Sequence, residues 1–145
     1  MPVYFILSKA RLLKEEKEKL VKEVTDTHCT TTGAPSNLVT VLFLSGYRLK
    51  QGKKAMLLGN IRTGGNRTQE IIDRLGHGLM MAMANTLHEP VWKIGLQFLG
   101  VQSNYVWEGG QVLPPPGEEL DGSSIRENDL QVSTYEKTNN KSFNN

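Results

Sequence analysis

The stretch Met1-Pro2-Val3-Tyr4-Phe5-Ile6-Leu7-Ser8 decides the fold, because it is a β-prone run that starts directly after the initiator methionine. Proline is small enough for that methionine to be removed during synthesis, so we expect the mature chain to begin at Pro2. The strand would then carry a secondary amine at its end. An ordinary α-amino group titrates at about 8, and its surroundings can make it a base or an acid at neutral pH. The ordinary alternative is a proline that only opens an edge strand.

Composition predicts one globular domain in a reducing compartment. The chain has 145 residues, 38% hydrophobic and 22% charged, which is enough to bury a core. No run approaches the roughly 20 apolar residues of a transmembrane helix, and the N-terminus lacks the pattern of a secretory signal. The single cysteine, Cys29, excludes an internal disulfide and a cysteine-based zinc cluster. We therefore expect a cytoplasmic protein with no metal site and no membrane partner.

Charge is spread unevenly along the chain. From residue 118 onward six acidic residues stand against three basic ones, so this segment carries −3 and residues 1–117 carry +5 of the total of +2. A basic body suits small anionic substrates. Nucleic acid is not predicted as a partner, because lysines alternate with glutamates in residues 14–22, as on a solvated helix face, and aromatic residues are not interleaved with the basic ones.

Hydrophobic periodicity predicts strand, helix and strand, and then the same order again. The expected strands are 3–8, 37–45, 55–61 and 91–99, and the expected helices are 13–32 and 68–87. Gly33 followed by Pro35 ends the first helix, and Pro90 ends the second. Gly76 and Gly78 weaken the second helix, which indicates close packing there.

The two halves are related by a shift of 55 residues, which superposes Leu20 on Leu75 and Pro35 on Pro90. Each half is then a parallel β-α-β unit with a right-handed crossover. Two units joined edge to edge give a four-stranded mixed sheet with both helices on one face. The strands are apolar on both sides, so the other face must also be covered. We therefore predict a homo-oligomer.

The last part of the chain is predicted to form an arm and a tail. Residues 103–116 indicate a short hairpin, with Gly109-Gly110 at its turn and Pro114-Pro115-Pro116 at its end. The polar, Asn-rich and Ser-rich sequence that follows is typical of disorder. We expect one domain, residues 2–117, and a tail, residues 118–145.

Topology predicts that several reactive side chains meet at Pro2. The helix of a β-α-β unit runs antiparallel to its strands, so its last turn, which contains His28, returns to the start of the first strand. The third strand would end at the same edge with Arg62. Arg67 would open the second helix there, where the helix N-terminus adds positive charge. Each residue alone also has an ordinary explanation, such as a histidine that binds the last helix carbonyls or a surface arginine.

Four short motifs stand out: Pro2-Val3-Tyr4, Thr25-Asp26-Thr27-His28, the loop from Arg62 to Arg67, and Glu108 followed shortly by Leu113-Pro114. Together they resemble the tautomerase superfamily, and most closely its cis-3-chloroacrylic acid dehalogenase-like subgroup. The resemblance covers residues 2 to about 118. It implies an α+β fold of two β-α-β repeats, a homotrimer, and a cofactor-free active site around an amino-terminal proline.

The resemblance also implies roles for single residues. Pro2 would be the catalytic acid or base. Arg62 and Arg67 would bind a substrate carboxylate, a task that suits the bidentate guanidinium. His28 and Glu108 would position and activate water.

The chain departs from the subgroup in two places. Its arginine loop is longer than the compact Arg-x-Gly-Arg form, so the sequence leaves open whether Arg67 reaches the position of the second arginine in that form. The dehalogenases carry a tyrosine on the last main strand, where the nearest residues here are Gln97 and Phe98, and we take Phe98 as a substrate contact. Tyr105 could replace that tyrosine only if the arm folds back.

We therefore predict a cofactor-free enzyme that acts through Pro2 on a small anionic carboxylate. A neutral Pro2 would catalyse keto–enol tautomerisation, and a protonated Pro2 would support hydration or hydrolytic dehalogenation of a 3-substituted acrylate. Arg62 and Arg67 oppose protonation, whereas Glu108 favours it, so both chemistries remain open. The alternatives are a malonate-semialdehyde-type decarboxylase and a non-catalytic binding or signalling protein with the same fold.

Overall fold

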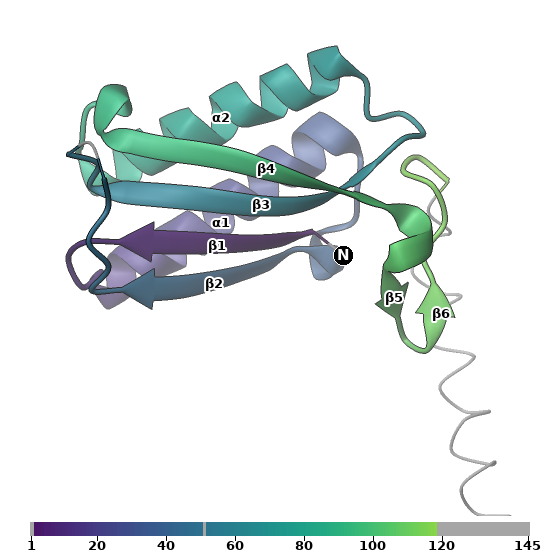
Figure 1. The fold of residues 1–145 in the computed structure, drawn as a ribbon, viewed down its shortest axis with the longest axis horizontal. Coiled ribbons are helices and arrows are strands. Elements are labelled where there is room, and N and C mark those ends of the chain that lie inside the picture. Colours follow the sequence, from purple (N-terminus) through teal and green to yellow (C-terminus); the bar gives the residue numbers. More distant parts are fainter. Residues whose placement is uncertain (1, 51, 119–145) are drawn as a thin grey trace, which may run out of the picture.

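A computed structural model describes residues 2–50 and 52–118. Four strands form one mixed sheet in the order β2-β1-β3-β4, and two helices cover one of its faces (Figure 1). The strands are β1 (Val3–Ser8), β2 (Thr40–Ser45), β3 (Ala55–Thr63) and β4 (Ile94–Gln102), and the helices are α1 (Lys14–Thr32) and α2 (Gln69–Leu87). β1 is parallel to β2 and antiparallel to β3, and β3 is parallel to β4. The predicted pair of β-α-β units is confirmed.

Two strands begin later than predicted because a short 3₁₀ turn precedes each of them. These turns are η1 (Ser36–Leu38) before β2 and η2 (Val91–Lys93) before β4. Each follows a proline whose carbonyl accepts a hydrogen bond three residues on, from Leu38 at 3.2 Å and from Lys93 at 2.8 Å. β3 and β4 also extend beyond their predicted ends at residues 61 and 99.

The predicted arm is a hairpin after a further 3₁₀ turn. Its elements are η3 (Ser103–Tyr105), β5 (Trp107–Glu108) and β6 (Gln111–Val112). Gly109 and Gly110, which connect β5 to β6, both have positive φ angles, 57° and 77°, so glycine suits this turn. The predicted disordered tail lies, apart from its first residue, outside the described residues. Within those residues, no helix is both long enough and apolar enough to span a membrane.

The 55-residue repeat holds in three dimensions. The bounds of α1 and η1, shifted by 55, are those of α2 and η2. Both helices end on a left-handed residue, Gly33 with φ 73° and His88 with φ 52°. The N–H of Gly33 donates to the carbonyl of Cys29, and the N–H of His88 donates to the carbonyl of Ala84. Donor and acceptor are both shifted by 55 residues between the two helix ends. The repeat therefore sets the backbone even where residue types differ.

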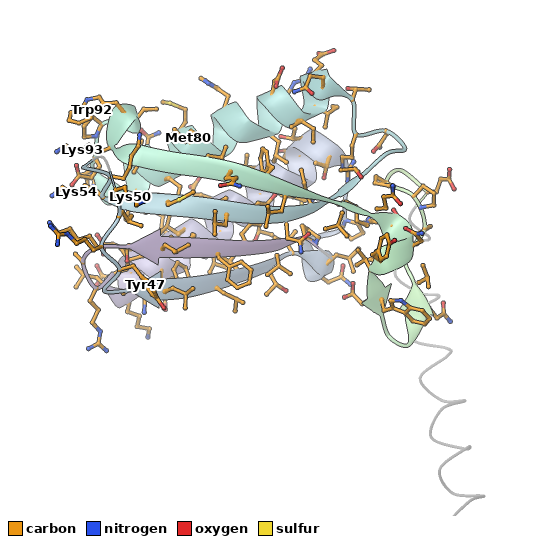
Figure 2. The ribbon with its side chains drawn as sticks, viewed as in Figure 1. Tyr47, Lys50, Lys54, Met80, Trp92 and Lys93 are labelled. Atoms are coloured by element: carbon orange, nitrogen blue, oxygen red, sulfur yellow. The ribbon has the colours of Figure 1, made fainter. Side chains whose placement is uncertain are left out.

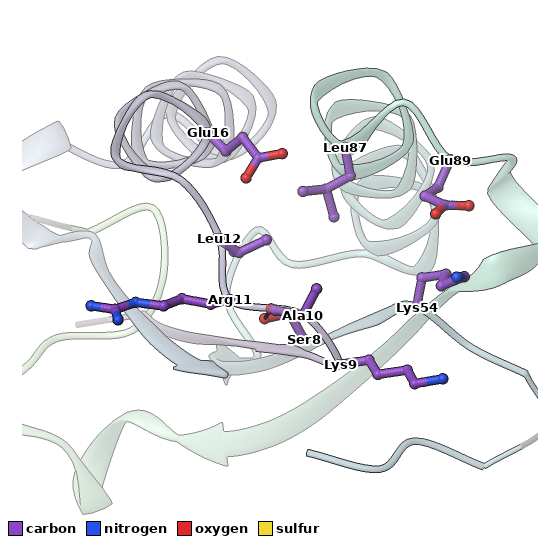
Figure 3. Close-up of a pocket in the computed structure, with 9 residues that line it drawn as sticks. All are labelled: Ser8, Lys9, Ala10, Arg11, Leu12, Glu16, Lys54, Leu87 and Glu89. Carbon is purple, nitrogen blue, oxygen red and sulfur yellow. Dashed lines mark hydrogen bonds between the residues drawn. The ribbon is translucent and has the colours of Figure 1, made fainter. Parts of the chain in front are cut away.

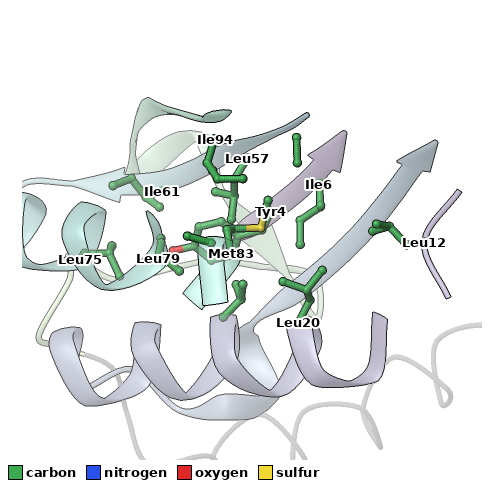
Figure 4. Close-up of a cluster of buried hydrophobic side chains, with 13 residues drawn as sticks. Tyr4, Ile6, Leu12, Leu20, Leu57, Ile61, Leu75, Leu79, Met83 and Ile94 are labelled. Carbon is green, nitrogen blue, oxygen red and sulfur yellow. The ribbon is translucent and has the colours of Figure 1, made fainter. Parts of the chain in front are cut away.

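The core lies between the sheet and the two helices (Figure 4). Its side chains come from alternate strand residues and from one stripe of each helix. Fully buried members are Tyr4, Ile6, Leu57, Leu20, Val24, Leu75, Leu79 and Met83. Burial of such a side chain stabilises the fold by about 1.5–3 kcal/mol. The helices pack closely, as predicted, because a Cβ on Gly78 would lie 2.7 Å from the Thr27 methyl.

Within the part of the chain that the structure describes, the other face of the sheet is bare of helices, and Figure 2 views the molecule from that side. On this face, Phe5 of β1 lies opposite Leu42 of β2 on one side and opposite Leu58 of β3 on the other. Leu42 and Leu99 are 43% and 50% exposed. The predicted apolar, uncovered face is confirmed.

Replacing His88 by glycine should raise the free energy of unfolding by about 0.5–1 kcal/mol, because glycine adopts the left-handed conformation without a side-chain penalty. Gly33 holds the matching position of the first half, so Gly33→Ala is the control and should lower stability by about 1 kcal/mol. Urea denaturation at one fixed protein concentration measures both. A His88→Gly midpoint at or below that of the wild type would contradict this account of the helix end.

Candidate active site

The last turn of α1 returns to the start of β1, as the topology predicts. There the Tyr4 hydroxyl oxygen lies 2.6 Å from Nδ1 of His28, and the two rings meet edge to face with centroids 5.7 Å apart. Both side chains are buried, with 0% and 2% exposed. Burial raises the pKa of Tyr4 far above its usual value, although the Arg67 guanidinium opposes this shift. Tyr4 is therefore a neutral phenol at physiological pH.

Pro2 lies directly before β1 and is buried. Its carbonyl accepts a hydrogen bond of 3.0 Å from the backbone N–H of Thr40, which continues the pairing of β1 with β2. Side chains alternate along a strand, so Pro2 belongs to the same face as Tyr4, which the helices cover. Pro2 and the Tyr4–His28 pair thus share one end of the helix-covered layer.

Arg67 joins the ends of the two helices. Its Nη1 donates to the backbone carbonyl of Thr32, in the last turn of α1, at 3.0 Å, and also to the Asn66 side chain. The cation therefore sits at the negative end of the α1 dipole. It is close enough to the Tyr4 hydroxyl to lower the pKa of that group. The longer loop still brings Arg67 to the edge where His28 lies.

Arg62 ties the arm to the sheet. Its side chain is 5% exposed and donates from Nη1 to the carbonyl of Pro114. The N–H of Asn66 donates to the carbonyl of Pro116 at 3.0 Å, and Gly65 lies so close to that carbonyl that a Cβ would be 2.1 Å away. The segment after β6 therefore folds back along the loop between β3 and α2. By strand alternation Arg62 belongs to the uncovered face, opposite that of Pro2.

The remaining predicted residues lie on β4 and on the arm. Glu108 is half-buried on β5, in the hairpin that lies beyond the N-terminal end of β1 (Figure 1). Phe98 packs against the core, and a Cβ on Gly59 would be 2.8 Å from a ring atom of Phe98 and of Tyr4. Phe98 is thus a neighbour of Tyr4. Tyr105 is 74% exposed, so the arm does not turn this ring inward.

The hydrogen bond between Tyr4 and His28 was not predicted from the sequence, although two features of the sequence indicate that these residues are close. Alternation places Tyr4 on the face of Pro2, and the crossover places His28 above that strand. Gly59 was also missed, yet it is the position of Tyr4 shifted by 55. A second large side chain there would collide with the rings that flank it.

A cavity of about 470 Å³ lies at the opposite end of the sheet (Figure 3). Cations line it together with carboxylates, among them Lys9, Lys54, Glu16 and Glu89. The length of β1 separates it from Pro2, so it is not part of the predicted site. Within residues 2–50 and 52–118, no three His, Cys, Asp or Glu side chains are grouped to hold a metal ion.

No protein-family model matches the sequence, and no curated protein matches it. Solved structures do match. N1, a member of the cis-3-chloroacrylic acid dehalogenase family, superposes with a TM-score of 0.73 at 21% identity, over 91% of this chain and 99% of its own. The fold is the tautomerase fold.

Two further structures agree with this assignment. Native fused 4-OT gives a TM-score of 0.66 at 20% identity, over 76% of this chain and 94% of its own. MIF2 of Leishmania major gives 0.63 at 14% identity, over 74% and 93%. The predicted fold class is confirmed.

Replacing Gly59 by alanine should lower the free energy of unfolding by about 1–3 kcal/mol, because the added methyl group overpacks the space between Tyr4 and Phe98. Gly76→Ala is the matched control: its methyl would meet the Leu96 side chain at 3.3 Å and the same Phe98 ring at 3.4 Å, and because alanine favours the helix, it should lower stability less than Gly59→Ala. Chemical denaturation measures both. Equal stability of Gly59→Ala and wild type would show that the two rings can move apart.

Proposed function

We propose that this chain is a cofactor-free tautomerase-superfamily enzyme of the cytoplasm, which uses an amino-terminal Pro2 as acid or base on a small anionic carboxylate. The observation that carries the proposal is the contact of 2.6 Å between Tyr4 and His28. This contact holds the His28 imidazole at the N-terminal end of β1, which is the end where Pro2 lies. The fold shared with N1 supports the same reading, and the single cysteine suits a reducing compartment.

The chemistry depends on the charge of the amine. A neutral Pro2 can take a proton from one position of a keto or enol acid and return it to another, which is tautomerisation. A protonated Pro2 can give its proton to a double bond while water, activated by His28 and Glu108, adds to it. Arg67 would favour the neutral amine, whereas Glu108 would favour the protonated one. We propose tautomerisation, hydration or hydrolytic dehalogenation, and the assays below distinguish among them.

Arg67 would bind the substrate carboxylate and stabilise developing negative charge. Arg62 was predicted to share this task, but it belongs to the face opposite that of Pro2 and holds the arm instead. Each guanidinium has a backbone carbonyl partner, Pro114 and Thr32 respectively, which sets its orientation. Phe98, beside Tyr4, would supply an apolar wall.

We also propose that the protein is a homotrimer. The uncovered face of the sheet exposes Leu42, Leu44 and Leu99 to solvent in the single chain, and such a patch marks an interaction site. Two structures of fused 4-OT with this fold, at 19% and 18% identity, are trimers. A trimer would bring a neighbouring chain to this face.

Loss of the amino-terminal proline should slow catalysis strongly. Pro2→Ala should ketonise phenylpyruvate enol at least about 100-fold more slowly than wild type, because alanine replaces the ring-held secondary amine by a primary amine whose position is less fixed. Hydration of 3-haloacrylates and propiolate is followed in parallel to compare the two chemistries. Pro90→Ala, at the other end of the sheet, is the control and should keep full activity.

Mass spectrometry accompanies these assays and should give a mature chain that begins at Pro2. A retained methionine would acylate the proline nitrogen and remove it as acid or base. That result, or equal rates in wild type and Pro2→Ala, would favour a non-catalytic binding role.

The double substitution Leu42→Glu with Leu44→Glu should dissociate the trimer, because it places charges in an apolar interface. Sedimentation velocity should show a loss of at least about 10-fold in trimer affinity. Val21→Glu is the control, since Val21 is equally exposed, at 41%, but lies on α1. A wild-type protein that sediments as a monomer would contradict the proposal.

A further inference from the structure

We propose that the cavity at the end of the sheet opposite Pro2 binds a small organic anion. The charged group of this ligand lies between Lys9 and Lys54, and its apolar part lies against Leu12 and Leu87. The cavity measures about 470 Å³, a size typical of small-molecule sites (Figure 3). The length of β1 separates it from Pro2, so its ligand is not the substrate of the proposed function.

The positive charge of the chain is concentrated at this end of the molecule. β1 and β2 end there, and β3 and β4 begin there. The connections and helix ends at this edge, residues 9–18, 46–54 and 88–93, carry nine basic and four acidic residues, a net charge of +5 with His neutral. The rest of residues 2–117 carries five of each and is neutral. The excess charge that suits an anion therefore surrounds this cavity and not Pro2.

Lys9 and Lys54 lie opposite each other, directly beyond the paired residues of β1 and β3. Ser8 is the partner of Ala55 in the antiparallel register, and the N–H of Lys9 donates to the carbonyl of Lys54 at 3.1 Å. Figure 3 shows both side chains extending to the same side. Like charges directly opposite each other on paired strands are destabilising. An anion between the two lysines removes this repulsion.

The two carboxylates that line the cavity already have partners. Oε2 of Glu16 accepts a hydrogen bond of 2.6 Å from the N–H of Leu13, at the start of α1. Oε2 of Glu89 lies 3.4 Å from Nζ of Lys93 in an ion pair. Within residues 2–50 and 52–118, by contrast, the two opposed lysines form no ion pair. The charge that the cavity offers to a ligand is therefore positive.

The wall of the cavity next to the helices is apolar and held in place. Leu12 is 8% exposed and belongs to the core, and Leu87, at the end of α2, packs against that core. The Ser8 hydroxyl donates to the carbonyl of Ala10 at 2.7 Å and so fixes the connection between β1 and α1. A bare charged group would leave this wall in water. The ligand class is therefore an anion with an aromatic or branched apolar body.

Titration of the full-length, ¹⁵N-labelled protein with benzoate, followed by amide chemical shifts, tests the site. The amides of Lys9 and Leu87 should shift saturably, whereas those of Tyr4 and His28 report separately on binding near Pro2. Pro2→Ala should leave the shifts at the cavity unchanged. Acetate should bind at least about 10-fold more weakly than benzoate, because it buries no ring against the apolar wall.

Two double variants with the same loss of charge locate the anion. Lys9→Gln with Lys54→Gln should weaken benzoate binding at least about 10-fold, because both cations next to the anion are lost. The control is Arg48→Gln with Lys50→Gln, at two exposed residues of the same end that do not line the cavity. Its affinity should change less than about 2-fold at about 0.15 M salt, where distant charges are screened.

Three results would overturn this site. Equal losses of affinity in the two double variants would show a general field instead of a located site. Equal affinities for benzoate and acetate would reject the apolar part of the ligand. Shifts confined to the amides around Tyr4 and His28 would place the anion at Pro2.

Discussion

Antiparallel pairing of β1 with β3 is the constraint on which the rest of the structure depends. Without this pairing, the first β-α-β unit would have no residue of the second half of the chain beside Pro2. The register runs from Val3 opposite Asn60 to Ser8 opposite Ala55, and it reverses the second unit relative to the first. α2 therefore begins at the edge where α1 ends. Arg67 can then hold the carbonyl of Thr32, and the candidate site draws on both halves.

The architecture could be predicted from the sequence because one hydrophobic pattern occurs twice. Both helix starts were predicted within one residue, since Leu13 and Thr68 are their N-caps. The starts of β2 and β4 were not. Leu38 and Val91 are apolar and read as strand residues, yet each lies in a 3₁₀ turn set by the proline before it. Periodicity reports burial, and it does not distinguish a short turn from the first residues of a strand.

The candidate site could be predicted in part. The return of His28 to β1 follows from the direction of the crossover helix, whereas its bond with Tyr4 depends on ring orientation. The tie between Arg62 and Pro114 depends on how an aperiodic arm folds back. Consecutive prolines lack N–H donors and offer only carbonyls. Those of Pro114 and Pro116 accept from Arg62 and Asn66, so the arm is held by acceptors that no hydrophobic pattern reveals.

The internal repeat makes the two halves alike in backbone and unlike in chemistry. Shifted by 55, Pro2 becomes Leu57, Tyr4 becomes Gly59 and His28 becomes Met83. Leu57 lies within the chain, so its nitrogen is a peptide amide and can never be an amine. In the second half Leu57 and Met83 fill the core, and Gly59 leaves space for the Tyr4 ring of the first half. The two halves therefore fit together because one carries a large ring where the other carries no side chain.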